Sequence, residues 1–203
     1  MKQLTIEKAL EIVKNKNELR FQHVLGTYEK AKELAKLYHI NEYKTLISAI
    51  LHDYAKNESL DSMKKIISDY LDPNMLNYNP VVYHGVVGAY LIQKELKIDD
   101  MDIINAVKYH VTGHPEMNDI AKIVYIADYT EKNRKQPSVE YCRSLSKISL
   151  DLGVLAVCDK TIEYLKKSNQ PDIHPLAEAT YQSFLKKVGV SVYDTFRNNY
   201  KGM

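Results

Sequence analysis

Two side chains that can bind metal ions stand next to each other at the end of an apolar run. The run begins near Leu46 and ends with His52 and Asp53, and Lys56 follows three residues after the aspartate. On a helix, Leu46, Ile50 and Asp53 share one face, so the carboxylate points toward the core. Because a buried carboxylate without a partner is strongly unfavourable, the sequence predicts that a compensating group lies beside Asp53.

Further histidine and aspartate side chains lie in other apolar segments, several of them at the end of the apolar stripe. They are His23, His84, His110 and Asp128. Taken singly, each histidine is more often a hydrogen-bonded core residue than a metal ligand. Taken together with the adjacent pair, the set favours metal ligation over a structural polar network. Imidazole and carboxylate groups suit iron, manganese or zinc better than calcium, and magnesium alone would be a poor match.

The elements that position these residues are expected to be helices. Apolar residues recur at three- and four-residue spacing and rarely alternate at period two, so the sequence predicts an all-α fold. The expected caps are Thr5, Asn41, Ser59 or Asp61, Asn79, Asp100 or Asp102, and Asn118. We expect helices at about 5–14, 18–38, 41–53, 59–71, 79–96, 100–111, 118–130, 139–147, 150–167 and 176–187, then a short C-terminal piece. Residues 72–80 and 131–138 are expected to be loops.

The length and composition favour one continuous domain. The 203 residues are enough to bury a sizeable core, and seven glycines, six prolines and no repeat of fixed period argue against linkers and solenoids. We therefore expect residues 1–203 to form a single domain. Its core spans about 18–132, and the C-terminal helices at about 139–200 pack on it.

Charge and cysteine content narrow the class of partners. The formal net charge is only +2, from 28 basic and 26 acidic side chains, so neither a nucleic-acid polymer nor a membrane is an expected partner. Cys142 and Cys158 are isolated and are expected to be small buried hydrophobic residues. The N-terminus has no apolar signal core, and a cytoplasmic location is expected. A homodimer is one assembly that the sequence permits.

The ordered set of histidines and aspartates resembles the HD-domain superfamily of metal-dependent phosphohydrolases, whose helical fold is named for its His-Asp pair. The resemblance covers about residues 20–130. It implies that His23, His52, Asp53 and Asp128 hold one metal ion. It also implies that His84 and His110 hold a second, with Asp53 bridging the two. A carboxylate can bridge two cations because it has two oxygens.

The segments around these residues resemble the YqeK family of symmetrical bis(5′-nucleosyl)-tetraphosphatases. They are residues 20–26, 51–56, 84–89, 109–113, 126–129 and 173–175, so the match extends over about residues 18–180. The resemblance implies an HD-domain helical bundle with additional C-terminal helices. It also implies an enzyme that splits diadenosine tetraphosphate into two ADP. Iron is the metal that it favours for the dinuclear centre, with manganese or zinc as alternatives.

The expected chemistry assigns roles to residues near the metals. Two cations about 3.5–4 Å apart can lower the pKa of a bound water and direct it at a phosphorus atom, so Asp53, Lys56 and Asp128 are the expected catalytic residues. Lys56 is expected to contact phosphate, being on the same helix end as Asp53. Arg20 and Arg134 could contact phosphate or form ion pairs instead.

The remaining expected substrate contacts follow His110 in the sequence or come from the resemblance. Thr112 and Gly113 follow His110, and a glycine there either admits a nucleotide or ends a helix. The resemblance alone implies substrate contacts for His84, His110, Ile173 and His174.

Two other functions fit the same residues. One is an HD phosphohydrolase that acts on mononucleotides or cyclic nucleotides, which would share every ligand. The other is a metal-stabilised helical module that binds nucleotides without turnover. The complete ligand set and Lys56 argue against the second alternative.

Overall fold

The described part of the chain folds into helices and connecting segments. The computed structural model describes residues 3–168 and 173–201, and no strand occurs in these ranges. The α-helices are α1 Ile6–Lys16, α2 Phe21–Leu37, α3 Glu42–Leu51, α4 Leu60–Tyr70, α5 Tyr83–Leu96, α6 Met101–Tyr109, α7 Asp119–Thr130, α8 Val139–Ile148, α9 Leu150–Lys167, α10 Pro175–Val188 and α11 Val190–Lys201. Three short 3-10 turns are η1 Glu18–Arg20, η2 Pro73–Asn77 and η3 Pro80–Val82. The expected all-α class is confirmed.

Side-chain caps begin most of the helices where the sequence predicts them. Thr5, Asn41, Ser59, Asp100 and Asn118 each accept a hydrogen bond from a backbone N–H two or three residues further on. Each cap satisfies an N–H group that the first helical turn leaves without a partner. Of the two pairs of alternatives, Ser59 rather than Asp61 caps α4, and Asp100 rather than Asp102 caps α6.

Three segments differ from the expectation. The segment 18–38 begins as the 3-10 turn η1, and α2 starts only at Phe21. The segment 72–80 is not a plain loop, because the side chains of Asp72 and Asn79 cap η2 and η3. The short C-terminal piece is the 12-residue helix α11.

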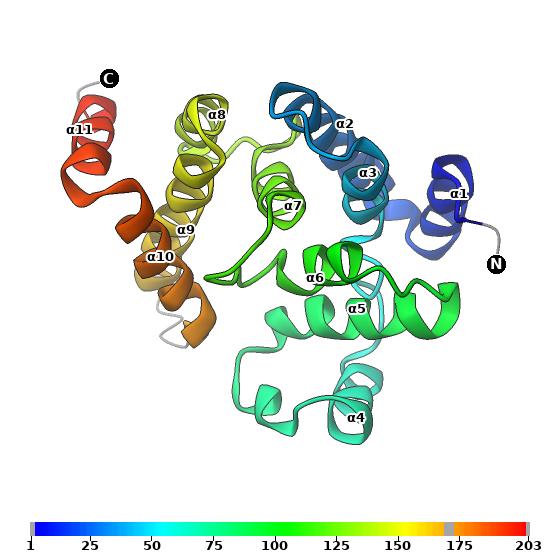
Figure 1. The fold of residues 1–203 in the computed structure, drawn as a ribbon. Helices are drawn as coiled ribbons and strands as arrows, with labels where there is room; N and C mark the ends of the chain where they lie inside the picture. Colours follow the sequence, from blue (N-terminus) through cyan, green and yellow to red (C-terminus); the bar gives the residue numbers. More distant parts are fainter. Residues whose placement is uncertain (1–2, 169–172, 202–203) are drawn as a thin grey trace.

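The helices pack around α7, which lies in the middle of Figure 1. There, α2 and α3 cover one side of α7, while α8 and α9 cover the other. The pair α5 and α6 lies below, with α4 against α5 at the base of the view. At the two edges, α1 packs against α3, and α10 packs against α9 and leads into α11.

The buried hydrophobic residues form two clusters. One gathers around α7, α8 and α9 and includes Ile123, Leu155 and Phe184. The other gathers around α1, α3 and α5 and includes Ile47 and Ile92. Three helices, α2, α3 and α6, contribute buried residues to both clusters. The two halves of the molecule are therefore packed through shared elements.

Helix ends position the central polar residues. His52 lies at the C-terminal end of α3, and His110 lies at the C-terminal end of α6. At the crossing of α5 and α6, a Cβ atom added to Gly85 would lie 2.8 Å from the carbonyl oxygen of Lys108. Glycine therefore lets the start of α5, with His84, approach the end of α6.

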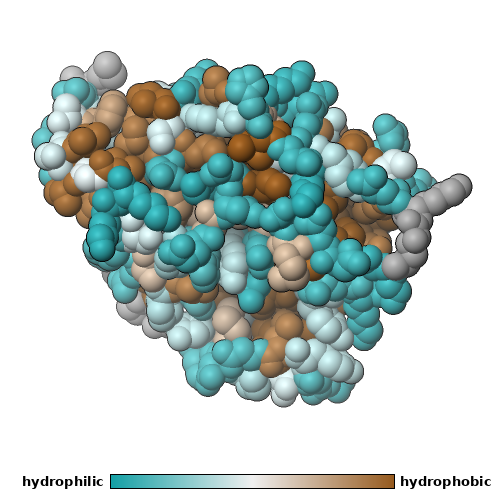
Figure 2. Space-filling model, in the orientation of Figure 1, coloured by the Kyte–Doolittle hydropathy of each residue, from teal (hydrophilic) through white to brown (hydrophobic). Residues whose placement is uncertain are grey.

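The surface is mixed in character. Figure 2 shows hydrophobic side chains near α11 in the upper left of the view. Two exposed valines, Val190 and Val192, belong to the first turn of this helix. Polar side chains are spread over much of the remaining visible face. Among the described residues, no helix combines the length and the apolar character needed to cross a membrane.

Candidate metal centre

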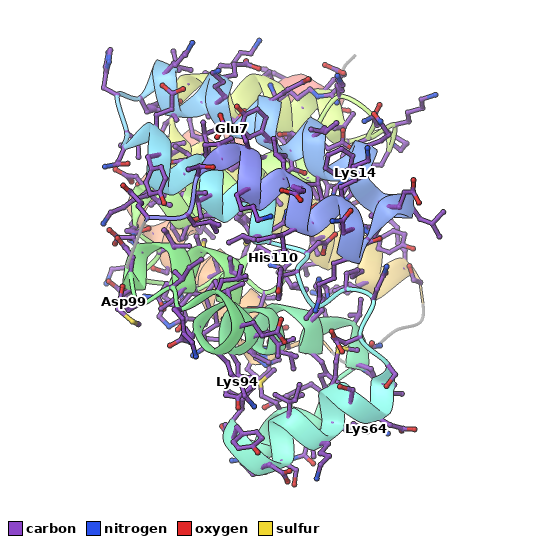
Figure 3. The ribbon with its side chains drawn as sticks, turned by 90° about the vertical axis from the view of Figure 1, so that its right-hand side faces the viewer. Glu7, Lys14, Lys64, Lys94, Asp99 and His110 are labelled. Atoms are coloured by element: carbon purple, nitrogen blue, oxygen red, sulfur yellow. The ribbon has the colours of Figure 1, made fainter. Side chains whose placement is uncertain are left out.

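The six expected ligands meet in the interior, although they come from five different helices or helix ends. Two groups have ligand atoms within 4.8 Å of one another. The first is His23, His52 and Asp53, and the second is Asp53, His84 and His110. Figure 3 shows His110 near the centre of the molecule, while the labelled lysines lie at its periphery.

Asp53 belongs to both groups through different oxygens. Its Oδ2 lies 3.4 Å from His52 Nε2 and 3.8 Å from His23 Nε2. Its Oδ1 lies 3.3 Å from His84 Nε2 and 3.7 Å from His110 Nε2. One carboxylate thus faces two pairs of imidazoles, which is the arrangement of a ligand that bridges two cations.

Asp128 completes the first group from the last turns of α7. Its Oδ1 lies 3.0 Å from His23 Nε2 and 3.8 Å from His52 Nε2. The first group therefore contains two imidazoles and two carboxylates. Such a mixed set of nitrogen and oxygen donors suits a transition metal.

The backbone determines which nitrogen of two rings faces the cluster. Nδ1 of His52 lies 2.7 Å from the carbonyl oxygen of Ala49, and Nδ1 of His110 lies 2.7 Å from that of Val107. A carbonyl only accepts a hydrogen bond, so both Nδ1 atoms carry the proton. In the neutral rings, Nε2 then presents a lone pair to the cluster.

The Nε2 atoms face one another at close range. His23 and His52 have their Nε2 atoms 3.2 Å apart, and His84 and His110 have theirs 3.1 Å apart. Two lone pairs at this distance repel each other unless a proton or a cation lies between or beside them. This contact is the reason why the residues fit a pair of metal ions better than a neutral polar network.

The carboxylates are strongly acidic in this environment. Burial opposes ionisation of Asp53, yet the surrounding imidazole groups of His52, His110 and His84 hold its pKa well below the usual range. Burial likewise opposes ionisation of Asp128, but its contact with His23 and nearby positive charges lower the pKa. Both side chains are therefore anionic and able to bind cations.

Lys56 and the buried His84 lie on the side of the cluster that lines a cleft. Burial, together with the nearby His110 and Lys56 side chains, lowers the pKa of His84 to about 4, so its ring is neutral at pH 7. The ammonium nitrogen of Lys56 lies 3.5 Å from both ring nitrogens of His84. Burial also lowers the pKa of Lys56.

Two arginines contact the ligand carboxylates. Arg20 places Nε 2.8 Å and Nη2 2.7 Å from Asp53 Oδ2. Arg134 places Nη2 2.8 Å from Asp128 Oδ1 and donates from Nε to the Asp128 carbonyl. The ion pairs considered for these arginines therefore form inside the site rather than on the outer surface. Both side chains remain partly exposed, at 35% and 37%.

The cluster opens into a cleft of about 700 Å³. This volume lies within the range of about 300–1,000 Å³ that small-molecule sites occupy. Arg20, Lys56 and Arg134 line the cleft beside the cluster, and Tyr129 and Tyr164 line its walls. The arrangement combines metal-binding groups, cationic side chains and aromatic rings in one cavity.

Four expected substrate contacts lie away from that cleft. Thr112 and His174 line a second pocket of about 560 Å³, which α5, α6 and the start of α10 enclose. Gly113 has a φ of +69°, and an added Cβ atom would lie 2.9 Å from the Thr180 side chain. Its role in ending the α6 segment is therefore sufficient to explain the glycine. Ile173 is half-buried beside the His174 cap of α10.

Sequence reasoning missed one buried acid beside the cluster. Glu131 lies directly after α7, and its Oε1 is 3.3 Å from His23 Nδ1. Because it begins a segment expected to be a polar loop, no periodicity marked it as buried. Its position three residues after Asp128 is the only sequence signal that could have drawn attention to it.

The helical fold and the His-Asp centre define an HD-domain protein, and the pattern of the HD domain family matches residues 20–133. A solved structure agrees with this class. It is described as a predicted HD superfamily hydrolase involved in NAD metabolism from Clostridium acetobutylicum. The TM-score is 0.84 at 28% identity, over 92% of this chain and 100% of that one.

Two curated relatives identify the family within this class. The symmetrical bis(5′-nucleosyl)-tetraphosphatase of Halalkalibacterium halodurans is 39% identical over 88% of this chain and 96% of the relative. The protein of the same name from Bacillus subtilis is 38% identical over 86% of this chain and 95% of the relative. The chain belongs to the family of symmetrical bis(5′-nucleosyl)-tetraphosphatases.

Proposed function

We propose that this chain is a metal-dependent hydrolase that cleaves diadenosine tetraphosphate symmetrically into two ADP. Membership of the tetraphosphatase family supports the activity. The observation that carries the proposal is the position of Asp53, whose two oxygens face two different histidine pairs at the base of an open cleft. This arrangement is typical of dinuclear hydrolytic centres.

The proposed centre uses the six converging side chains. His23, His52, Asp53 and Asp128 would hold one metal ion, and Asp53, His84 and His110 would hold the second. When bound, such cations supply Lewis acidity toward phosphoryl oxygens and lower the pKa of water. Iron is the proposed metal, with manganese or zinc as alternatives, because imidazole and carboxylate donors suit all three.

Charged side chains around the centre are proposed to orient the polyphosphate. Lys56 places its ammonium group against His84 and lines the cleft, where it can contact a phosphate oxygen. Arg20 and Arg134 hold the carboxylates of Asp53 and Asp128 in place. Because each guanidinium group carries five N–H donors, both can also contact phosphate from their exposed edges.

We propose that cleavage is symmetrical because the site places the central phosphoanhydride bond of the substrate at the metal centre. Water adds across the central phosphoanhydride bond, so that its oxygen remains on one ADP while the other ADP leaves with the bridging oxygen. Tyr129 and Tyr164 offer ring faces in the same cleft, on which a base can stack. We keep as proposals the further substrate contacts of His84, His110, Thr112, Gly113, Ile173 and His174.

The decisive experiment is a product assay. Purified protein loaded anaerobically with Fe²⁺ is incubated with diadenosine tetraphosphate, and the products are separated by ion exchange. ADP alone is expected, whereas AMP with ATP would indicate asymmetric cleavage and absence of turnover would refute the proposal. A panel of mononucleotides and cyclic nucleotides tests the alternative substrates. Faster turnover of any of them would replace the proposed substrate.

Lys56 provides a test of phosphate binding that leaves the metal ligands in place. We expect Lys56→Gln to lower kcat/KM by about 100-fold, because a cation aimed at the polyphosphate is lost. Metal content should remain that of the unaltered protein. Lys132→Gln is the matched control, because Lys132 pairs with Glu29 on the surface. Loss of metal in Lys56→Gln would show instead that the lysine supports the centre.

The cellular location and the oligomeric state of the enzyme are also proposals. A small nucleotide substrate requires neither a nucleic-acid polymer nor a membrane, and both cysteines are free and buried, as a reducing cytoplasm allows. We infer a cytoplasmic location from these points. Formation of a homodimer stays a prediction, which light scattering on the purified protein would test.

A further inference from the structure

His23 differs from the other cluster histidines in what contacts its outer nitrogen. In His52 and His110, Nδ1 faces a backbone carbonyl of the same helix end. In His84, the ammonium nitrogen of Lys56 lies 3.5 Å from Nδ1. In His23, Nδ1 faces the carboxylate of Glu131 at 3.3 Å, 108 residues away in the sequence. His23 thus depends on a distant, charged side chain for its orientation.

Glu131 is held firmly in this position. Its side chain is only 2% exposed, and its Oε2 accepts a hydrogen bond of 2.6 Å from the backbone N–H of Asn133. Arg143 from α8 donates to the carbonyl oxygens of Thr130 and Glu131, at 2.8 Å and 2.6 Å. A carboxylate buried to this degree needs such partners, so its place beside His23 is built by several elements.

The opposite wall of this niche is the backbone of α2. Gly26 lies one helical turn after His23, and a Cβ atom added there would overlap Glu131 Oε2 and lie 3.0 Å from Glu131 Cδ. Any larger residue would push the carboxylate away from its site. Glycine at this position therefore makes room for the acid beside the histidine.

The contact with Glu131 gives the proton on His23 Nδ1 an acceptor. Carboxylates only accept hydrogen bonds, and two of them face this ring, because Glu131 Oε1 lies 3.3 Å from Nδ1 and Asp128 Oδ1 lies 3.0 Å from Nε2. When Nε2 gives up its proton to bind a cation, the remaining proton stays on Nδ1 and is donated to Glu131. Carboxylates behind ligand histidines commonly fix the tautomer and raise the basicity of the ligand nitrogen.

We propose that Glu131 is a positioning residue that holds His23 in the Nδ1-protonated form and orientation for metal binding, and that Gly26 is glycine in order to admit it. Glu131 lies on the side of His23 away from the cluster, so it is not itself a ligand. Arg143 supports Glu131 indirectly, through its hydrogen bonds to the carbonyl oxygens of Thr130 and Glu131. The inference depends on the proposed metal centre and is independent of which nucleotide is cleaved.

The first test measures metal affinity. Glu131→Gln keeps the size of the side chain but removes its charge, and Mn²⁺ affinity is measured by competition with a chelator. We expect affinity to fall by about 10- to 100-fold, as for other residues that support ligand histidines. Gly26→Ala should cause a loss of the same order, because it displaces the carboxylate. Glu29→Gln is the matched control, since this exposed glutamate of α2 pairs with Lys132 and contacts no ligand.

The second test observes the imidazole directly. Long-range ¹H–¹⁵N spectra of the Zn²⁺-loaded protein at pH 8 report on the ring N–H protons of each histidine. We expect the Nδ1–H proton of His23 to be shifted downfield and to exchange slowly with water in the unaltered protein, and to lose both features in Gly26→Ala. A His23 Nδ1–H proton that exchanges rapidly with water in the unaltered protein would overturn the inference, whether or not the variants fold.

The outcomes separate this inference from the proposed function. If the unaltered protein binds Mn²⁺ and Glu131→Gln binds it as tightly as Glu29→Gln does, the positioning role fails while the metal centre stands. If the unaltered protein binds no metal, the proposed centre fails. If affinity falls as expected but diadenosine tetraphosphate is not cleaved, only the proposed substrate fails.

Discussion

Asp53 links the two halves of the candidate centre, so its loss and the loss of a single histidine should differ in effect. Its two oxygens serve different imidazole pairs, whereas His84 approaches only Oδ1. Removing the shared carboxylate disturbs both groups. Removing His84 alone leaves the group of His23, His52 and Asp128 complete.

We therefore predict graded losses of metal in two variants. In His84→Ala, Mn²⁺ content should fall by about half, while in Asp53→Asn it should approach zero, because only the aspartate serves both sites. Turnover should fall by at least about 100-fold in both variants. Elemental analysis and the product assay measure the two effects.

A surface histidine supplies the control for these variants. His39→Asn should retain full metal content, since His39 is exposed and asparagine tolerates its positive φ of 54°. Undiminished metal in Asp53→Asn would contradict a bridging role. Equal loss of helical signal in the two cluster variants would indicate a structural polar core instead.

The cysteines provide a pH-dependent prediction at the same scale. Burial raises the pKa of the Cys142 and Cys158 thiols from about 9 to about 12. Below pH 9, the reactive thiolate should therefore be about 1,000-fold rarer than in an exposed thiol, and its fraction should rise tenfold per pH unit. The native protein should react slowly with a disulfide reagent at pH 8, and the unfolded protein rapidly. Rapid labelling of both thiols in the native protein would contradict this burial.

The sequence could predict which residues form the cluster but not how they are held. Histidine and aspartate at the ends of apolar stripes are visible in local spacing, so His23, His52 and Asp128 could be named. The contact of Arg20 with Asp53 spans 33 residues, and that of Glu131 with His23 spans 108. No local pattern encodes such pairs, because they depend on the packing of separate helices.

At the level of elements, features that depend on local contacts could be predicted from the sequence, whereas features that depend on distant contacts could not. Helix starts were predictable because a cap contacts backbone two or three residues away, as Asn41 does with the N–H of Lys44. The extent of α11 was not, because distant partners hold it. Tyr193 donates to Asp159 at 3.1 Å, and Tyr200 donates to the carbonyl oxygen of Pro137 at 2.8 Å.

Replacing a helical glycine by alanine should change the stability of the protein in opposite directions at two positions. In α9, a Cβ atom on Gly153 would lie 2.8 Å from Ile126 Cδ1 and 3.0 Å from Ser146 Cα, so Gly153→Ala should cost about 1–3 kcal/mol. In α5, the nearest atom to a Cβ on Gly88 is 3.4 Å away, on Val107. Gly88→Ala should therefore stabilise the protein by up to about 1 kcal/mol through helix propensity.

Chemical denaturation in the presence of a chelator checks this pair, because metal binding then cannot obscure the packing effect. The two midpoints should move in opposite directions from that of the unaltered protein. Destabilisation by both substitutions to the same extent would mean that the close approach of α9 to α8 is not what distinguishes the two sites.

At the scale of the whole molecule, the sharing of helices between the two hydrophobic clusters determines how the chain should unfold. Buried residues of α3 belong to both, with Ala49 in one cluster and Ile47 in the other. The two groups of candidate metal ligands lie where these helices meet. Loss of either cluster would therefore expose apolar surface of the other, which favours a single cooperative unit.

We propose on this basis that residues 1–203 form one domain, and we predict a single unfolding transition. Ile92→Val removes a fully buried methyl group from the cluster around α5 and should cost about 0.5–1.5 kcal/mol. Hydrogen exchange followed by mass spectrometry, with increasing denaturant, reports on each helix separately. The midpoint for α8 and α9, in the other cluster, should fall as far as that for α5. If instead α8 and α9 keep their original midpoint while α5 opens early, the two clusters unfold independently and the chain contains two domains.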